Sequence, residues 1–178
     1  MDSQQLNLLN QVLRLASDRE VPFSTSFNRP ANVTPYAAED AVNDGTSNLT
    51  FTPVGGDATK AGFMYYIKSL RVVTNNATIT NGAFRLYILN TTQTPVIADN
   101  AQQTLLFANI DKVIGFIDFS LTTGGTGSDA AEAYITDIDI PVVLTGSTIS
   151  GYLVAKGAYV PTSGQSFFIR LDTYTKNV

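Results

Sequence analysis

The stretch FMYYIKSLRVVTNNATITNGAFRLYILN, residues 63–90, is the part of the chain that most clearly predicts its fold. It contains two apolar-rich runs, Phe63–Thr74 and Gly82–Asn90, on either side of a polar segment rich in asparagine. Alternate residues of the second run share one apolar face: Phe84, Leu86 and Ile88. A period of two is typical of a half-buried β-strand, and asparagine and glycine accept the positive φ values of tight reversals. We therefore expect the two runs to pair as antiparallel strands at the centre of a sheet.

Turn signals divide the rest of the chain into further segments of strand length. The expected strands are Val21–Phe27 (a short edge strand), Tyr36–Val42, Leu49–Pro53, Lys112–Leu121, Ala133–Leu144, Thr148–Ala158 and Gln165–Thr173, with a bend or end at Pro141 and a short helix around Asn100–Ala108. About eight strands separated by turns favour an antiparallel β-sandwich or jelly roll. The scarcity of helices between strands argues against an α/β fold.

The first residues of the chain have a different pattern. Apolar side chains recur there at spacings of three and four, which places them on one face of a helix: Leu6, Leu9, Val12, Leu13 and Ala16. We therefore expect an N-terminal helix or arm over residues 1–26 and a sandwich domain over residues 27–178. Two interpretations of the arm remain open: a lid over one end of the sheet core, or a segment that docks on a neighbouring subunit or partner. In the second case the partner-binding residues are Leu6, Leu9, Val12 and Leu13.

Composition excludes several classes of function. The chain has no cysteine and no histidine, so it can form neither a disulfide, a cysteine-based zinc site nor a Ser-His-Asp triad. Its net charge is −4, and its 11 lysines and arginines are scattered, which argues against nucleic-acid binding. No apolar run approaches the roughly 20 residues that a membrane-spanning helix needs. The N-terminus also lacks the pattern of a signal peptide, so we expect synthesis in the cytoplasm.

Carboxylates two residues apart are the first candidates for chemistry. Asp137 and Asp139 would face the same way on a strand, as a calcium site or a glycosidase pair requires. The alternative is a solvated outer face, because the further oxygen ligands that calcium needs are absent at suitable spacing. Asp129 and Glu132, beside a glycine-rich loop, have the same two interpretations.

Three further patterns have weaker functional interpretations. The loop Gly124–Gly127 lacks the lysine of a phosphate-binding P-loop, so we interpret it as a plain loop. Asn-x-Thr triplets at positions 32, 48, 76 and 90 are interpreted as products of turn composition rather than glycosylation sites. Four tyrosines can form a sugar-stacking platform or pack at strand rims: Tyr65, Tyr66, Tyr87 and Tyr152. No combination of base, nucleophile and orienting group is recognisable, so we expect no enzymatic activity, cofactor or metal.

Three segments of the chain carry a resemblance to a known family. These are Phe27–Val42 (FNRPANVTPYAAEDAV), Asn76–Leu86 (NATITNGAFRL) and Ser150–Val160 (SGYLVAKGAYV). Here the chain resembles the jelly-roll head decoration (cement) proteins of tailed bacteriophages, in the same order over roughly residues 27–175. The resemblance implies a non-enzymatic virion subunit, a homotrimer on the outer surface of the capsid that bridges major capsid proteins. It implies no catalytic residues, and no motif identifies the residues that touch the capsid.

Two other functions remain to be distinguished from decoration. The same all-β body can serve as a receptor-binding or carbohydrate-binding module of a phage head fibre or tail fibre, using rim tyrosines. A small polysaccharide-degrading enzyme using Asp137 and Asp139 is the third hypothesis, although no other sequence feature points to that activity.

Overall fold

The computed structural model describes residues 4–5, 20–46, 48–55, 62–79, 81–104, 107–124 and 129–175, and these form an antiparallel all-β fold. The strands in chain order are β1 (Glu20–Asn28), β2 (Ala41–Val42), β3 (Leu49–Pro53), β4 (Met64–Thr74), β5 (Ala83–Leu89), β6 (Val113–Ser120), β7 (Thr122–Thr123), β8 (Ala131–Ile135), β9 (Ile140–Val143), β10 (Ile149–Ala155) and β11 (Ser166–Thr175). A single 3₁₀ helix, η1 (Phe107–Lys112), precedes β6. The predicted all-β sandwich class is confirmed.

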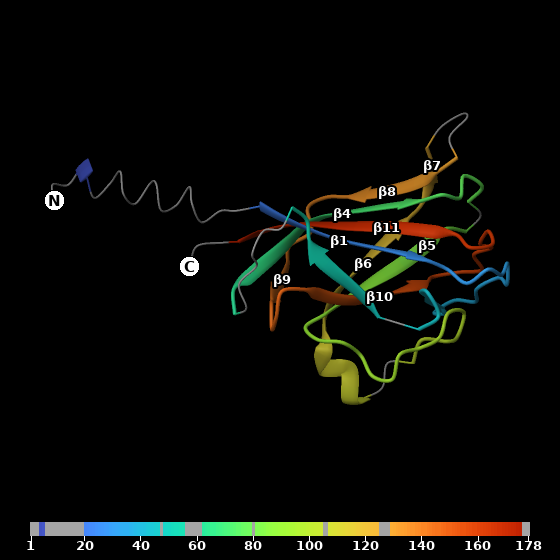
Figure 1. Ribbon diagram of the computed structural model, residues 1–178, viewed down its shortest axis with the longest axis horizontal. Coiled ribbons are helices and arrows are strands. Elements are labelled where there is room, and N and C mark those ends of the chain that lie inside the picture. The colour runs from blue at the N-terminus through green and yellow to red at the C-terminus, as the bar shows by residue number, and fades with distance from the viewer. Residues whose placement is uncertain are drawn as a thin grey trace.

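The strands form two layers that are joined at one side (Figure 1). One layer has the order β1-β11-β4-β8-β7, with β9 also paired to β4, and the other has the order β3-β10-β5-β6, with β2 also paired to β10. Strand β3 pairs with both β1 and β10, so it links the two layers into one continuous sheet. Strand β6, at the far end of this order, packs near β8 and β9. The sheet is therefore folded on itself and encloses the main hydrophobic core.

The two runs of residues 63–90 are strands, but our prediction that they pair with each other is wrong. Strand β4 pairs with β11, β8 and β9, whereas β5 pairs with β10 and β6 in the other layer. The connecting segment is anchored to the core instead of forming a tight hairpin. Asn76 is only 3% exposed, and its side-chain amide donates a hydrogen bond to the hydroxyl of Tyr159. The chain therefore crosses from one layer to the other.

Strand β1 is longer and more central than the sequence predicts. It pairs with β11 over its whole length, from Glu20 opposite Tyr174 to Asn28 opposite Ser166, and it also pairs with β3. It is therefore not an edge strand. The expected boundary between arm and domain at residue 26 falls inside this strand, so residues 20–26 are part of the sheet. Pro22 lacks a backbone N–H to donate, but its carbonyl oxygen accepts a hydrogen bond from the backbone N–H of Val54.

Other boundaries also differ from the prediction. The segment 133–144 contains two strands, β8 and β9, and Pro141 lies within β9, which pairs only with β4 among the described residues. A proline is accepted there because an edge strand leaves one side of its backbone without a ladder partner. Of Tyr36–Val42, only Ala41–Val42 is a strand. The helix expected at Asn100–Ala108 is replaced by η1, which begins at Phe107.

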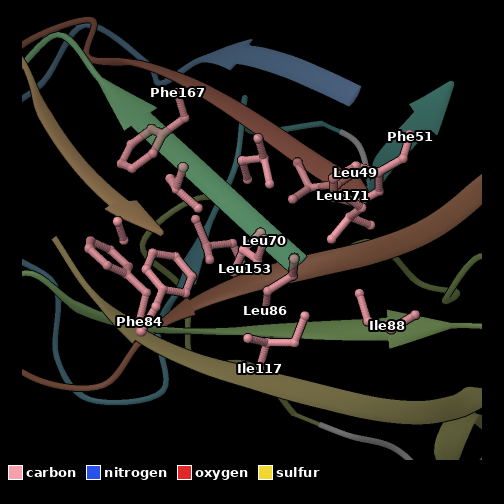
Figure 2. Close-up of a cluster of buried hydrophobic side chains, with 14 of the residues drawn as sticks. Leu49, Phe51, Leu70, Phe84, Leu86, Ile88, Ile117, Leu153, Phe167 and Leu171 are labelled. Atoms are coloured by element: carbon pink, nitrogen blue, oxygen red, sulfur yellow. The ribbon is translucent and has the colours of Figure 1, made fainter. Parts of the chain in front are cut away.

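The core lies between the two layers and is made of the inward-facing residues of both (Figure 2). Phe84, Leu86 and Ile88 of β5 are each fully buried, as their alternation predicts. They face Leu70 from β4 and Leu171 from β11 across the interior. Burying a side chain of this size contributes about 1.5–3 kcal/mol to stability. This core holds the outer faces of the two layers, and the loops at their ends, in fixed positions.

Candidate functional site

Tyr159 is the centre of a buried polar network at one end of the sandwich. It is fully buried, and its ring lies 6.1 Å from the ring of Tyr36 and 5.0 Å from that of Phe84. Its hydroxyl donates to Oε1 of Gln165 at 2.7 Å and accepts a hydrogen bond from Asn76 at 3.1 Å. Tyr159 therefore joins the connector after β1, the crossover between β4 and β5, and the loop after β10.

A buried ion pair extends this network. Arg29 Nη2 lies 3.0 Å from Asp99 Oδ2, and the two side chains are 0% and 4% exposed. The hydroxyl of Tyr36 donates to Asp99 Oδ1 at 2.6 Å and accepts a hydrogen bond from Arg29 Nε. The backbone N–H of Asn43 also donates to Asp99. Because each member has several partners, the loops that carry them are fixed relative to one another.

Burial keeps the tyrosines of this network protonated. It is the largest cause that raises the pKa of Tyr36 above its usual value, and the hydrogen bond to Asp99 raises this pKa further. Burial likewise raises the pKa of Tyr159, although its hydrogen bonds with Asn76 and Gln165 partly offset the effect of burial. Both hydroxyls therefore remain hydrogen-bond donors at neutral pH. This network has a structural role, because its hydrogen bonds hold the loops at this end of the sandwich together.

The outer face of β8, β4 and β11 is a charged surface with a shallow hollow. Arg71 of β4 lies opposite Arg170 of β11 on one side and Tyr134 of β8 on the other. These side chains, with Glu132 and Asp172, line a hollow of about 430 Å³. Arg71 Nη2 is 3.3 Å from Glu132 Oε2, and Arg170 Nε is 2.7 Å from Asp172 Oδ1.

The outer face of the opposite layer carries a row of aromatic rings. Phe116 of β6, Tyr87 of β5 and Tyr152 of β10 lie opposite one another in the strand register. The ring of Tyr87 stacks on that of Tyr152 at 4.6 Å and lies 6.0 Å from Phe116. Arg85 covers the ring of Phe116 at 3.8 Å and binds Asp118 through two hydrogen bonds of 2.6 and 2.7 Å. These bonds lower the pKa of the Asp118 carboxyl.

The structure corrects the expected geometry of the aspartate pair. Asp137 and Asp139 lie in the loop between β8 and β9, not on a strand, and Asp137 has a φ of 59°. Asp137 accepts a hydrogen bond from Thr136 at 3.0 Å, and Asp139 accepts one from the hydroxyl of Tyr174 at 3.0 Å. The alternation of a strand therefore does not hold their carboxylates on one face.

The other predicted patterns have separate places in the structure. Glu132 lies on β8 and pairs with Arg71, whereas Asp129 borders a second hollow. Asn76 of the second-to-last Asn-x-Thr triplet is buried and bonded to Tyr159, so the folded protein cannot be glycosylated there. Residues 125–128 of the glycine-rich loop lie outside the described residues.

The four predicted tyrosines do not form one platform. Tyr65 is buried in the core, and Tyr66 stacks with Tyr174 on the outer face of the first layer. Only Tyr87 and Tyr152 come together, on the second layer. The sequence analysis did not identify Phe116 as the third ring, because only the register of β5 against β6 places it beside Tyr87.

The predicted partner-binding residues cannot be placed. Leu6, Leu9, Val12 and Leu13 lie outside the described residues, where only Gln4 and Gln5 of the expected helix are described, both helical. The sequence analysis also missed Arg29, Asp99 and Tyr159 as network members, since no local pattern links residues so far apart.

Two other kinds of feature are absent from the described part of the chain. No cluster of three or more acidic side chains there has the geometry to hold a metal ion. No helix there has both the length and the apolar character to span a membrane. The sequence matches no model of a known protein family, and it matches none of the curated proteins.

Proposed function

We propose that this chain is a structural protein of a tailed-bacteriophage virion. It is a decoration (cement) subunit that binds the outer face of the head as a homotrimer and stabilises contacts between major capsid proteins. It acts by shape and surface contact, without catalysing a reaction.

One observation carries this proposal. The three segments that resemble decoration proteins are far apart in sequence, yet all three meet around Tyr159. Tyr36 of the first segment stacks on it, Asn76 of the second bonds to its hydroxyl, and Tyr159 itself belongs to the third. Backbone hydrogen bonds join them as well, from Tyr36 to Tyr159 and from Lys156 to Ala83. The resemblance therefore covers one packed unit, as a shared fold requires, rather than unrelated turns.

The form of the surface supports the same function. The hollow on the first layer is open and lined by side chains that are partly exposed, such as Arg71 at 54%. Subunits that cover a symmetric shell need many modest contacts repeated by symmetry rather than one deep pocket. An open, shallow hollow on a rigid body suits this role.

Binding to heads tests the proposal. Heads of the phage that encodes the protein would be prepared without it. Purified protein would then be added, and the heads with any bound protein would be pelleted by centrifugation. We expect saturable binding with hundreds of copies per head, since a symmetric shell repeats each site many times. Analytical ultracentrifugation should give a mass of three chains. A monomer that does not pellet with heads, or a handful of copies per virion, would contradict the proposal.

A second candidate is a carbohydrate-binding module of a head or tail fibre. It is favoured by the exposed end of the aromatic row, where Phe116 is 49% exposed and Tyr87 lies beside it, whereas Tyr152 at the other end is buried. Sugar rings pack on aromatic faces, and Arg85 and Asp118 beside the row can bond hydroxyl groups. A glycan array distinguishes the two functions. Binding of one glycan class that is lost on Tyr87→Ala would favour the fibre module, whereas no specific glycan binding favours decoration.

A further inference from the structure

The hollow on the outer face of β8, β4 and β11 has more hydrogen-bond donors than acceptors. Arg71 and Arg170 face each other directly across β4 and β11, an arrangement that like charges normally disfavour. Each guanidinium carries several N–H donors in a fixed fork. Among the described side chains, Arg71 uses one of them on Glu132, and Arg170 uses one on Asp172.

Of the two carboxylates in the hollow, Glu132 accepts a hydrogen bond from Arg71 through one oxygen, whereas Asp172 accepts through both. Both oxygens of Asp172 are bonded, one by Arg170 and the other by the hydroxyl of Ser69 at 2.9 Å. These bonds hold Arg170 in place from one side. A ligand that supplies acceptor oxygens to the two guanidiniums therefore fits the hollow, and a carboxylate matches the geometry of an arginine fork.

The surroundings of the hollow resemble the centre of a protein–protein contact. Tyr134 beside Arg71 is 63% exposed, and Phe168, two residues before Arg170 on β11, is 42% exposed. Phe168 and Val73 help to line a second, adjacent hollow of about 270 Å³ whose surface is mainly apolar. Tyrosine and arginine are enriched among the residues that dominate binding energy at interfaces.

We propose that this face of the sandwich is the surface that meets the major capsid protein, and that the hollow between Arg71, Arg170 and Tyr134 receives an acidic side chain from it. The inference rests on the proposed function and deepens it, because it names the face and the chemistry of the contact. The carboxylate binds both guanidiniums, and an apolar neighbour on the capsid protein fills the space beside Phe168.

Binding of variants to heads tests this inference. The double variant Arg71→Ala/Arg170→Ala should raise the dissociation constant for heads at least tenfold, which corresponds to about 1.4 kcal/mol. The single variant Arg170→Glu should weaken binding further, because it places a carboxylate where the partner's carboxylate binds. Added salt should weaken the wild-type protein more than the double variant. Urea denaturation of each variant would show that the fold is kept.

A matched control lies on the opposite layer. Arg85→Ala also removes an arginine that is paired with a carboxylate, on the outer face of β5, and it should leave the binding of heads unchanged. If the wild-type protein binds heads but the double variant binds equally well, or if Arg85→Ala weakens binding instead, this inference is overturned while the proposed function stands. If the wild-type protein does not bind heads, the proposed function itself fails.

Discussion

The ion pair of Arg29 and Asp99 is the point where a single residue affects the fold most strongly. Removing two charges from water is costly, so a buried pair contributes little net stability compared with apolar residues of the same size. Removing only one partner, in contrast, destabilises the fold strongly, because the remaining charge stays buried without a charge to offset its loss of hydration. Asp99 is only 4% exposed and holds Tyr36 and Asn43 as well as Arg29.

We therefore predict that Arg29→Met lowers the free energy of unfolding by about 3–5 kcal/mol. Urea denaturation followed by circular dichroism would measure it. The double variant Arg29→Met/Asp99→Leu should be more stable than Arg29→Met alone, because it leaves no unpaired buried charge. Lys68→Met, which breaks an exposed pair with Glu20, should cause no measurable change. If Arg29→Met and Lys68→Met lowered the free energy of unfolding equally, burial of the Arg29–Asp99 pair would not explain its effect on stability.

The sequence contains no signal that predicts this pair. Arg29 and Asp99 are 70 residues apart, and neither lies in a strand that the sequence predicts. The same limit applies to the outer-face surfaces, because Arg71 and Arg170 become neighbours only through the register of β4 against β11. Residue types could be identified in advance, but their partners depend on tertiary structure.

At the scale of elements, strand existence was predictable and strand pairing was not. The alternation at Phe84, Leu86 and Ile88 predicted β5 and its buried face, because a sheet with one face on the core requires it. The polar segment after β4 suggested a hairpin, since asparagine and glycine favour reversals. The structure instead buries Asn76 against Tyr159, and this tertiary hydrogen bond directs the chain into the other layer.

Gly151 in β10 shows how closely two paired strands approach. A Cβ atom at this position would lie 2.7 Å from the carbonyl oxygen of Tyr87 and 3.3 Å from the ring of Phe51. The first of these is backbone, which cannot move aside without disturbing the pairing of β10 with β5. Gly146, in the turn before β10, has no atom within 4 Å of the same point and no positive φ.

We predict that Gly151→Ala destabilises the protein by about 1–3 kcal/mol, the range for overpacking a well-packed interior. Gly146→Ala, with the same chemical change in open space, should leave the free energy of unfolding within error of the wild-type value. Thermal and urea unfolding of both variants would test this. A Gly151→Ala protein as stable as Gly146→Ala would show that β10 and β5 are not held at this distance.

At the scale of the whole molecule, one sheet folded on itself leaves two outer faces of different character. The first layer exposes paired charges with tyrosine and phenylalanine beside them, and the second exposes the ring of Phe116, which Arg85 partly covers. The network around Tyr159 fixes the loops at one end of both layers. A body held together in this way presents its surfaces rigidly, which suits the proposed docking on a viral shell.

Three buried tyrosines make the stability of the protein fall at alkaline pH. Burial is the first cause that raises the pKa of Tyr36, Tyr152 and Tyr159 above the ordinary value of about 10. A hydroxyl whose pKa is raised by folding ionises first in the unfolded chain. Above about pH 10 the unfolded chain therefore binds fewer protons, and the free energy of unfolding falls as pH rises. Below that pH these groups are protonated in both states, and their contribution is constant.

We predict that these tyrosines ionise only as the chain unfolds, and that urea-unfolding midpoints fall steadily above about pH 10. Tyrosinate absorbance and circular dichroism in one titration would measure both. Tyr152→Phe should make the fall shallower, because the hydroxyl of Tyr152 is buried without a hydrogen-bond partner among the described residues and its removal breaks no bond. If all the tyrosines ionised while the protein stayed folded, the tightly closed interior described above would be wrong.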